Sequence, residues 1–144
     1  PKHRAAAGRP SVIRRAITLV LHNPAAARDL DASRLEGLGR PGADLLRELI
    51  ETVQSEPDIT TAGLLERWRN HDKGRHLGKL AAVEVPEDED FDAGAELADC
   101  LHQLALSGIR QRVEFLIEKQ KVTQLSEAER SELRALGRSA GAGP

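Results

Sequence analysis

Two arginines beside aliphatic residues form the most chemically specific cluster in the chain. Arg9 and Arg14 lie next to Val12, Ile13 and Ile17 at the start of the first predicted helix. A guanidinium binds a carboxylate through two parallel hydrogen bonds, and an apolar floor can receive a hydrophobic side chain. The pattern suits a site for the carboxyl end of a peptide, and it suits equally well two ordinary solvated arginines.

The other reactive residue types form no catalytic or metal-binding pattern. The five histidines occur in different segments, and none stands at zinc-ligand spacing from a cysteine or a carboxylate. His71 and His76 flank a short turn, and we expect both to be solvated. Cys100 lies among leucines, which is typical of a small buried side chain. The acidic run at 87–90 follows a proline, so we expect a solvated linker. We therefore predict no catalytic residue, no metal site and no cofactor.

The composition favours an all-α fold. Aromatic residues make up 2% of the 144 residues, so the core must consist mainly of Leu, Ile, Val and Ala, which suits packing of helix on helix. The net charge is −2, with 21 basic and 23 acidic residues, so no global field attracts nucleic acid or a membrane. The single cysteine and the lack of a long apolar run indicate a cytoplasmic protein. Because the chain contains no Met, we expect it to be a piece of a longer protein.

Apolar residues at helical spacing predict a bundle of amphipathic helices after a basic tether at residues 1–9. The predicted helices of the bundle cover residues 10–22, 43–55, 60–70 and 75–85. The first is apolar over more than half of its circumference, so we expect it to lie at the centre of the bundle. The whole helical bundle subdomain is assigned to residues 10–107.

A long helix is predicted from Phe91 to about Val122, a length of about 45 Å. The rhythm of its apolar residues slips at Gly108, which we interpret as a hinge where the helix leaves the bundle. Ser126 and Glu129 have the spacing of a capping box and predict the start of a last, short helix. Residues 108–144 then form a C-terminal helical hairpin, and we expect the glycine-rich end after Leu136 to fray.

Several stretches in order resemble the C-terminal helicase-binding domain of bacterial DNA primase. Together they extend over nearly the whole chain. They are Ile17-Thr-Leu-Val-Leu-His-Asn-Pro24, Leu35-Glu-Gly-Leu-Gly39, Leu46-Arg-Glu-Leu-Ile50, Ile59-Thr-Thr-Ala-Gly-Leu-Leu-Glu66, Leu77-Gly-Lys-Leu80 and Leu125-Ser-Glu-Ala-Glu-Arg130. The resemblance implies a helical bundle followed by a hairpin at the end of a long connecting helix.

The resemblance also implies two binding sites. The terminal hairpin would dock on the N-terminal domain of the replicative helicase through Leu125, Arg130, Leu133, Arg134, Leu136 and Arg138. This hairpin, the arm of the domain, would be stabilised by Ile109, Val113, Leu116 and Ile117. A second site would bind the C-terminal tail of single-stranded DNA-binding protein through Arg9, Val12, Ile13, Arg14, Ile17 and Leu80. The implied domain is monomeric, and catalysis would belong to other parts of the primase.

Two other interpretations stay open at this stage. The chain could be the N-terminal assembly domain of the helicase itself, which would form dimers or rings. It could also be a DNA-binding helical module that uses Arg67 and Arg69 on the predicted helix at 60–70, although the slightly acidic charge argues against this role.

Overall fold

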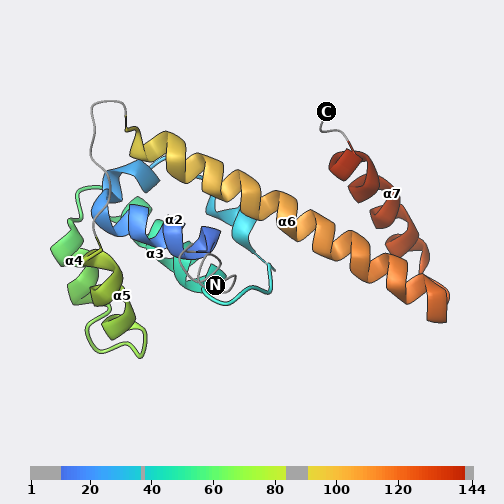
Figure 1. The fold of residues 1–144 in the computed structure, drawn as a ribbon, viewed down its shortest axis with the longest axis horizontal. Helices are drawn as coiled ribbons and strands as arrows, with labels where there is room; N and C mark the ends of the chain where they lie inside the picture. The colour runs from blue at the N-terminus through green and yellow to red at the C-terminus, as the bar shows by residue number, and fades with distance from the viewer. Residues whose placement is uncertain (1–10, 37, 84–90, 142–144) are drawn as a thin grey trace, which may run out of the picture. The chain divides into compact units, whose positions relative to one another are not determined.

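The computed structural model describes residues 11–36, 38–83 and 91–141. Every regular element in these ranges is a helix, so the prediction of an all-α fold is confirmed (Figure 1). None of the described helices is long and apolar enough to cross a membrane. The predicted tether at 1–9 and the acidic run at 87–90 lie outside the described residues.

The central helix is α2, Val12–His22. Ser11 is its N-cap, and the Ser11 side chain accepts a hydrogen bond of 3.1 Å from the backbone N of Arg14. The helix ends at Asn23, because the residue before a proline is pushed out of the helical region. As expected of a central element, it contacts a short 3₁₀ helix, η1 (Pro24–Ala27), and three further helices. These are α3 (Ala43–Ser55), α4 (Thr61–Arg67) and α5 (Gly74–Ala81).

Helix α3, Ala43–Ser55, has the predicted bounds. It begins after Gly42, whose φ of +89° lies in the left-handed region that glycine tolerates best. One face is completely buried, with Leu46, Leu49 and Ile50 each at 0% exposure. A second 3₁₀ helix, η2 (Ala32–Leu35), also packs on α3.

Helices α4, Thr61–Arg67, and α5, Gly74–Ala81, are shorter than predicted. Thr60 caps α4 as expected, because its side chain accepts a bond of 3.1 Å from the backbone N of Gly63. The extension of α4 to Asn70 was wrong, since the chain turns at the buried Trp68. A Cβ on Gly74 would lie 2.2 Å from the carbonyl oxygen of Trp68, so this tight turn requires glycine.

Helix α6, Ala93–Val122, has 30 residues and confirms the long predicted helix. It begins two residues later than predicted, where the Asp92 side chain accepts a bond of 3.0 Å from the backbone N of Ala95. The helix continues through Gly108 without interruption. The chain forms two compact units, of which one ends at His102 and the other begins at Gln103, so α6 contributes residues to both.

Helix α7, Glu127–Gly141, corrects the expectation of a short last helix. We expected the chain to fray after Leu136, but the helix continues for more than a turn. One glycine inside a helix costs only about 1 kcal/mol relative to alanine, and the neighbouring Ala, Leu and Arg are good helix formers. Because the sequence places no proline between Glu127 and Gly141, nothing blocks the helical hydrogen bonds there.

Candidate functional site

A pocket of about 290 Å³ opens in the first unit beside the start of α2. Its lining residues come from α2, from the loop and first turn of α3, and from the turn that leads into α5. They are Ser11, Ile13, Arg14, Ile17, Pro41, Gly42, Leu45, Lys73 and His76. Aliphatic side chains therefore line the same cavity as an arginine, a lysine and a histidine.

The residues predicted to bind a peptide tail are only partly brought together by this pocket. Ile13, Arg14 and Ile17 line it, and Arg14 is exposed while the two isoleucines are buried. Val12 is half-buried and Leu80 is 1% exposed, and neither belongs to the lining. Arg9 lies outside the described residues.

The other walls of the pocket were not predictable from the sequence. Lys73 is the residue before α5, and His76 lies in the first turn of that helix. We expected His76 to be solvated, and it is exposed, but it lines the pocket. A Cβ on Gly42 would lie 3.0 Å from Cγ2 of Ile13, so glycine allows the loop before α3 to approach α2 closely.

The pocket has an electropositive lining. None of the described lining residues carries a carboxylate. Among the described ion pairs, Arg15 next along α2 binds Glu96 at 2.7 Å, whereas Arg14 and Lys73 pair with no carboxylate in the described part of the chain. An arginine and a lysine beside Ile13 and Ile17 can receive a ligand that has both an anionic and a hydrophobic group.

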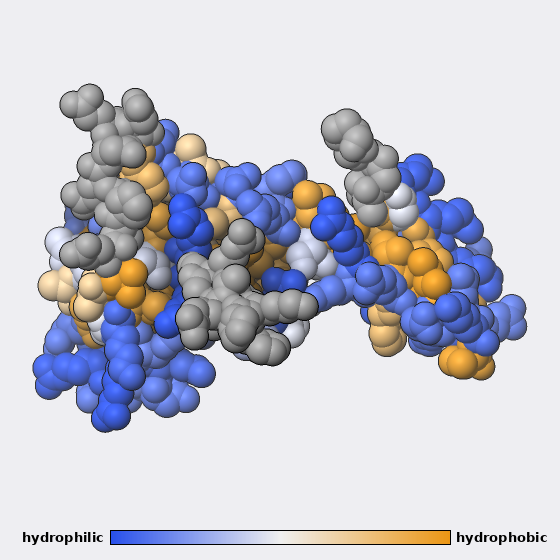
Figure 2. Space-filling view, viewed as in Figure 1, coloured by the Kyte–Doolittle hydropathy of each residue, from blue (hydrophilic) through white to orange (hydrophobic). Residues whose placement is uncertain are grey.

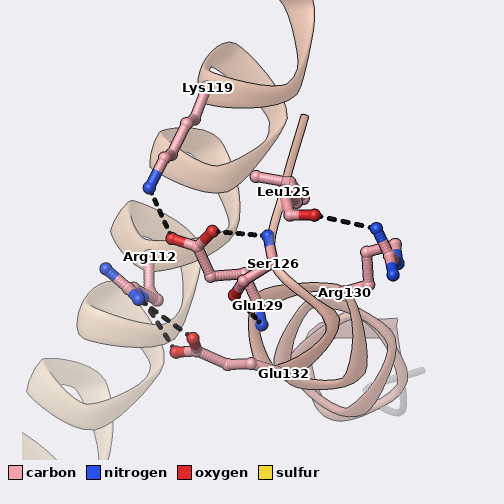
Figure 3. Close-up of polar contacts among 7 residues, drawn as sticks. All are labelled: Arg112, Lys119, Leu125, Ser126, Glu129, Arg130 and Glu132. Carbon is pink, nitrogen blue, oxygen red and sulfur yellow. Dashed lines mark hydrogen bonds and ion pairs between the residues drawn. The ribbon is translucent and has the colours of Figure 1, made fainter. Parts of the chain in front are cut away.

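The second unit is a hairpin in which polar contacts join the later part of α6 to α7 (Figure 3). The Arg112 guanidinium donates from Nε and Nη2 to the two carboxylate oxygens of Glu132, at 2.8 and 2.9 Å. Lys119 Nζ donates to Glu129 at 2.6 Å. The Arg112 guanidinium also lies 5.2 Å from the ring centre of Phe115. These ion pairs link residues from both helices of the hairpin.

The predicted capping box at the start of α7 is confirmed. The backbone N of Ser126 donates to the Glu129 carboxylate at 2.9 Å, and the backbone N of Glu129 donates to Ser126 Oγ at 3.0 Å. The hydrogen bond from Lys119, together with that from Ser126, lowers the pKa of Glu129 to about 2. The pKa of Glu132 is also lowered, mainly by its hydrogen bond with Arg112.

The residues predicted to bind a helicase differ in their accessibility. Leu125 is only 4% exposed, and Arg130 Nη1 donates to the Leu125 carbonyl oxygen at 2.8 Å, so both residues shape the turn before α7. On α7, Leu133 and Leu136 are half-buried, and Arg134 and Arg138 are exposed. The surface of this helix thus presents partly exposed leucines and exposed arginine side chains.

The residues predicted to stabilise the arm also differ in how far they are buried. Leu116 is completely buried, and Ile109 and Val113 are half-buried. Ile117 is 38% exposed, so it is the most exposed of the four residues, although most of its surface is still covered. The helix turns this residue away from the buried position of Leu116, its neighbour in the sequence.

Hydrophobic side chains are exposed on the hairpin unit, where Figure 2 shows orange surface among hydrophilic residues. Phe115 is 53% exposed and Val122 is 85% exposed. Neither residue was predicted from the sequence to be exposed. Both belong to α6, as does Ile117. The large apolar side chains of an amphipathic helix normally face the core of a domain.

The contacts of α4 do not support DNA binding. Arg67 pairs with Glu56, and Arg69 pairs with Glu66 at 3.2 Å, so both guanidiniums offered for phosphate are already neutralised by carboxylates. No cluster of His, Cys, Asp and Glu among the described residues has the arrangement of a metal site.

Comparison with known proteins decides between the remaining interpretations. The family described as DNA primase DnaG DnaB-binding matches residues 13–136. The chain belongs to this family. The match covers α2 to α7 as far as Leu136, so both units are part of this primase domain.

Individual primases agree with the family assignment. The domain is 34% identical to the DNA primase of Escherichia coli strain K12 over 123 residues, which are 81% of this chain and 20% of that protein. It is 33% identical to the DNA primase of Legionella pneumophila over 142 residues, which are 94% of this chain and 23% of that protein. The chain thus spans about a fifth of the length of the curated relatives it matches.

A solved structure shares the fold of this primase domain. It is the C-terminal domain of DnaG primase from Vibrio cholerae, with a TM-score of 0.70 and 30% sequence identity. The similarity covers 88% of this chain and 92% of that chain. These findings favour a primase domain over the helicase's own N-terminal domain and over a DNA-binding module.

Proposed function

We propose that this domain is the helicase-binding adaptor of a bacterial DNA primase. It recruits the primase to the replicative helicase at the fork, where RNA primers are made in the cytoplasm. The observation that carries this proposal is the family match across residues 13–136. Primer synthesis belongs to other parts of the primase, so the domain acts through binding and uses no catalytic residue, metal or cofactor.

The hairpin is the part of the domain that docks on the helicase N-terminal domain. Leu133 and Leu136 are three residues apart and are therefore neighbours on the surface of α7. Arg134 and Arg138 are exposed beside them and can meet acidic groups of the partner. Leu125 and Arg130 contribute by holding the turn at the start of α7 in place.

Calorimetric titration of the purified helicase N-terminal domain with this chain tests the docking. Deletion of residues 123–144 should abolish binding. Arg134→Glu should weaken it about tenfold or more, because it reverses a charge at the contact. Arg110→Glu is the matched control, since Arg110 is an exposed arginine of α6 in the same unit. Unchanged affinity after the deletion would show that the docking assignment is wrong.

The domain is proposed to be a monomer before it meets the helicase. Light scattering of the purified chain tests this point, since a single-chain mass is expected over a range of concentrations. A concentration-dependent increase to dimers or rings would contradict a monomeric adaptor.

The pocket beside α2 supports a second binding function, capture of the C-terminal tail of single-stranded DNA-binding protein. Arg14 lies at a cavity lined by Ile13, Ile17 and Leu45, which suits a carboxylate attached to a hydrophobic residue. Arg14→Ala should weaken binding of an acidic peptide that ends in Phe and leave helicase binding nearly unchanged. Equal losses in both assays would argue against two separate sites.

A further inference from the structure

We infer that Lys73 and His76 form a donor wall of the pocket that binds the side-chain carboxylates of an acidic peptide tail, while Arg14 binds its terminal carboxylate. Neither residue belongs to the set that the family resemblance implies. The inference rests on the proposed binding of the tail, and it assigns the residues that recognise its acidic part.

The fold places the donor wall across from the residues of α2. Ile13, Arg14 and Ile17 belong to one helix. Lys73 precedes α5 and His76 lies in its first turn, about 60 residues later in the sequence, yet all five residues line one cavity. Contacts between α2 and α5 bring these segments together.

The backbone before α5 holds the donor wall in position. The backbone N of Lys73 donates to His71 Nδ1 at 3.0 Å, which stabilises the turn. The next residue, Gly74, approaches the Trp68 carbonyl so closely that a side chain has no room. Lys73 and His76 are therefore attached to a tightly defined turn, although their side chains are exposed.

The chemistry of the lining divides the two roles. The Arg14 guanidinium can grip a planar carboxylate in two places and lies on the same helix as Ile13 and Ile17, so it suits a terminal carboxylate next to a hydrophobic residue. The Lys73 ammonium is a compact charge on a flexible stem, and His76 supplies a ring N–H. Such donors suit side-chain carboxylates earlier in the peptide.

The absence of acidic side chains favours this occupant. No described lining residue carries a carboxylate, and neither Lys73 nor His76 forms an ion pair with the described acidic residues. A peptide with several acidic residues before a hydrophobic end has more carboxylates than one guanidinium can bind. The donor wall provides partners for them.

Fluorescence anisotropy with three labelled peptides tests the assignment. The first is Asp-Asp-Asp-Leu-Pro-Phe with a free carboxyl end, the second has Asn in place of each Asp, and the third ends in a carboxamide. Lys73→Ala and His76→Ala should each weaken binding of the first peptide about threefold, as for a partly exposed charged contact. Arg14→Ala should weaken it about tenfold.

The peptide variants separate the two roles. Lys73→Ala and His76→Ala should have no effect on the Asn peptide and keep their effect on the carboxamide, whereas Arg14→Ala should lose its effect on the carboxamide. Arg75→Ala is the matched control, because this exposed arginine of α5 lies between the two donors and does not line the pocket. Circular dichroism verifies that all variants are folded.

Each result leads to a definite conclusion. If the unaltered chain binds none of the peptides, the tail-binding proposal and this inference both fail. If Arg14→Ala weakens binding but Lys73→Ala and His76→Ala do not, the pocket stands and the donor wall is overturned. Equal losses from Lys73→Ala and Arg75→Ala would also overturn it, because they would show a general effect of charge.

Discussion

The two compact units of this primase domain are stabilised in different ways. The unit that ends at His102 contains most of the buried hydrophobic residues, among them Leu46, Leu49 and Ile50 of α3. In the described part of the hairpin unit, the buried hydrophobic residues are Leu104, Leu116 and Leu125, and ion pairs join α6 to α7.

This difference indicates how the units divide stability and binding. Burial of apolar surface is the main source of folding free energy, whereas exposed ion pairs contribute little. We therefore expect the hairpin to open more readily than the bundle. It also exposes Phe115 and Val122, and a hydrophobic surface on a locally adaptable element is suited to a protein partner. The bundle instead holds its pocket on well-packed helices.

The largest expected effect comes from a cavity in the bundle. Leu49→Ala removes a side chain with 0% exposure and should lower the free energy of unfolding by about 3 kcal/mol, measured in urea by circular dichroism. Leu49→Met keeps most of the volume and should cost less than about 1.5 kcal/mol.

A leucine truncation in the hairpin tests whether the two units unfold independently of each other. Leu116→Ala should increase hydrogen exchange in α7 and leave the amides of α3 protected, because Leu116 belongs to the other unit. If Leu116→Ala destabilised α3 as much as Leu49→Ala does, the two units would unfold as one and the comparison would fail.

A second effect concerns the turn that carries the donor wall. Gly74→Ala would place a Cβ 2.2 Å from the Trp68 carbonyl oxygen, so it should destabilise the bundle by about 1 to 3 kcal/mol. Gly78→Ala in the same helix meets nothing within 4 Å and should stabilise it by up to about 1 kcal/mol. Thermal unfolding of the two variants measures both changes in stability. Similar melting temperatures for Gly74→Ala and Gly78→Ala would mean that the turn tolerates a side chain.

A smaller effect, confined to the hairpin, depends on pH. The folded pKa of Glu129 is about 2, below the ordinary value of 4.5. The stabilisation that ionised Glu129 gives to the folded hairpin is therefore complete above pH 4.5 and is lost as the pH falls toward 2. NMR titration should show the low pKa, and α7 should lose protection across this range. Glu129→Gln should remove that pH dependence, while Glu127→Gln, in the same turn, should keep it. A normal Glu129 titration would show that the Lys119 contact contributes nothing.

The smallest expected effect tests the end of α7. Gly137→Ala meets no neighbouring atom within 4 Å and should raise the helicity and stability of the hairpin by about 0.5 to 1 kcal/mol. Hydrogen exchange of the α7 amides measures the change. Faster exchange in the variant would contradict a continuous helix at this position.

The sequence determined the features that depend on local patterns. The apolar spacing of α3 and the long α6 predicted their bounds closely, because helical periodicity repeats within each segment. The capping box of Ser126 and Glu129 was predictable for the same reason, since its partners are three residues apart. The ordered stretches of the resemblance were enough to indicate the primase family, which the match over residues 13–136 confirmed.

Only the tertiary structure decided the contacts between distant residues. Nothing local places Lys73 and His76 beside Ile13, because that depends on how α5 packs on α2. The pairing of Arg112 with Glu132 likewise requires α7 to fold back along α6. Periodicity and capping are properties of one segment, whereas a pocket or an interhelical ion pair depends on the packing of several helices, which the spacing of residues along the chain does not specify.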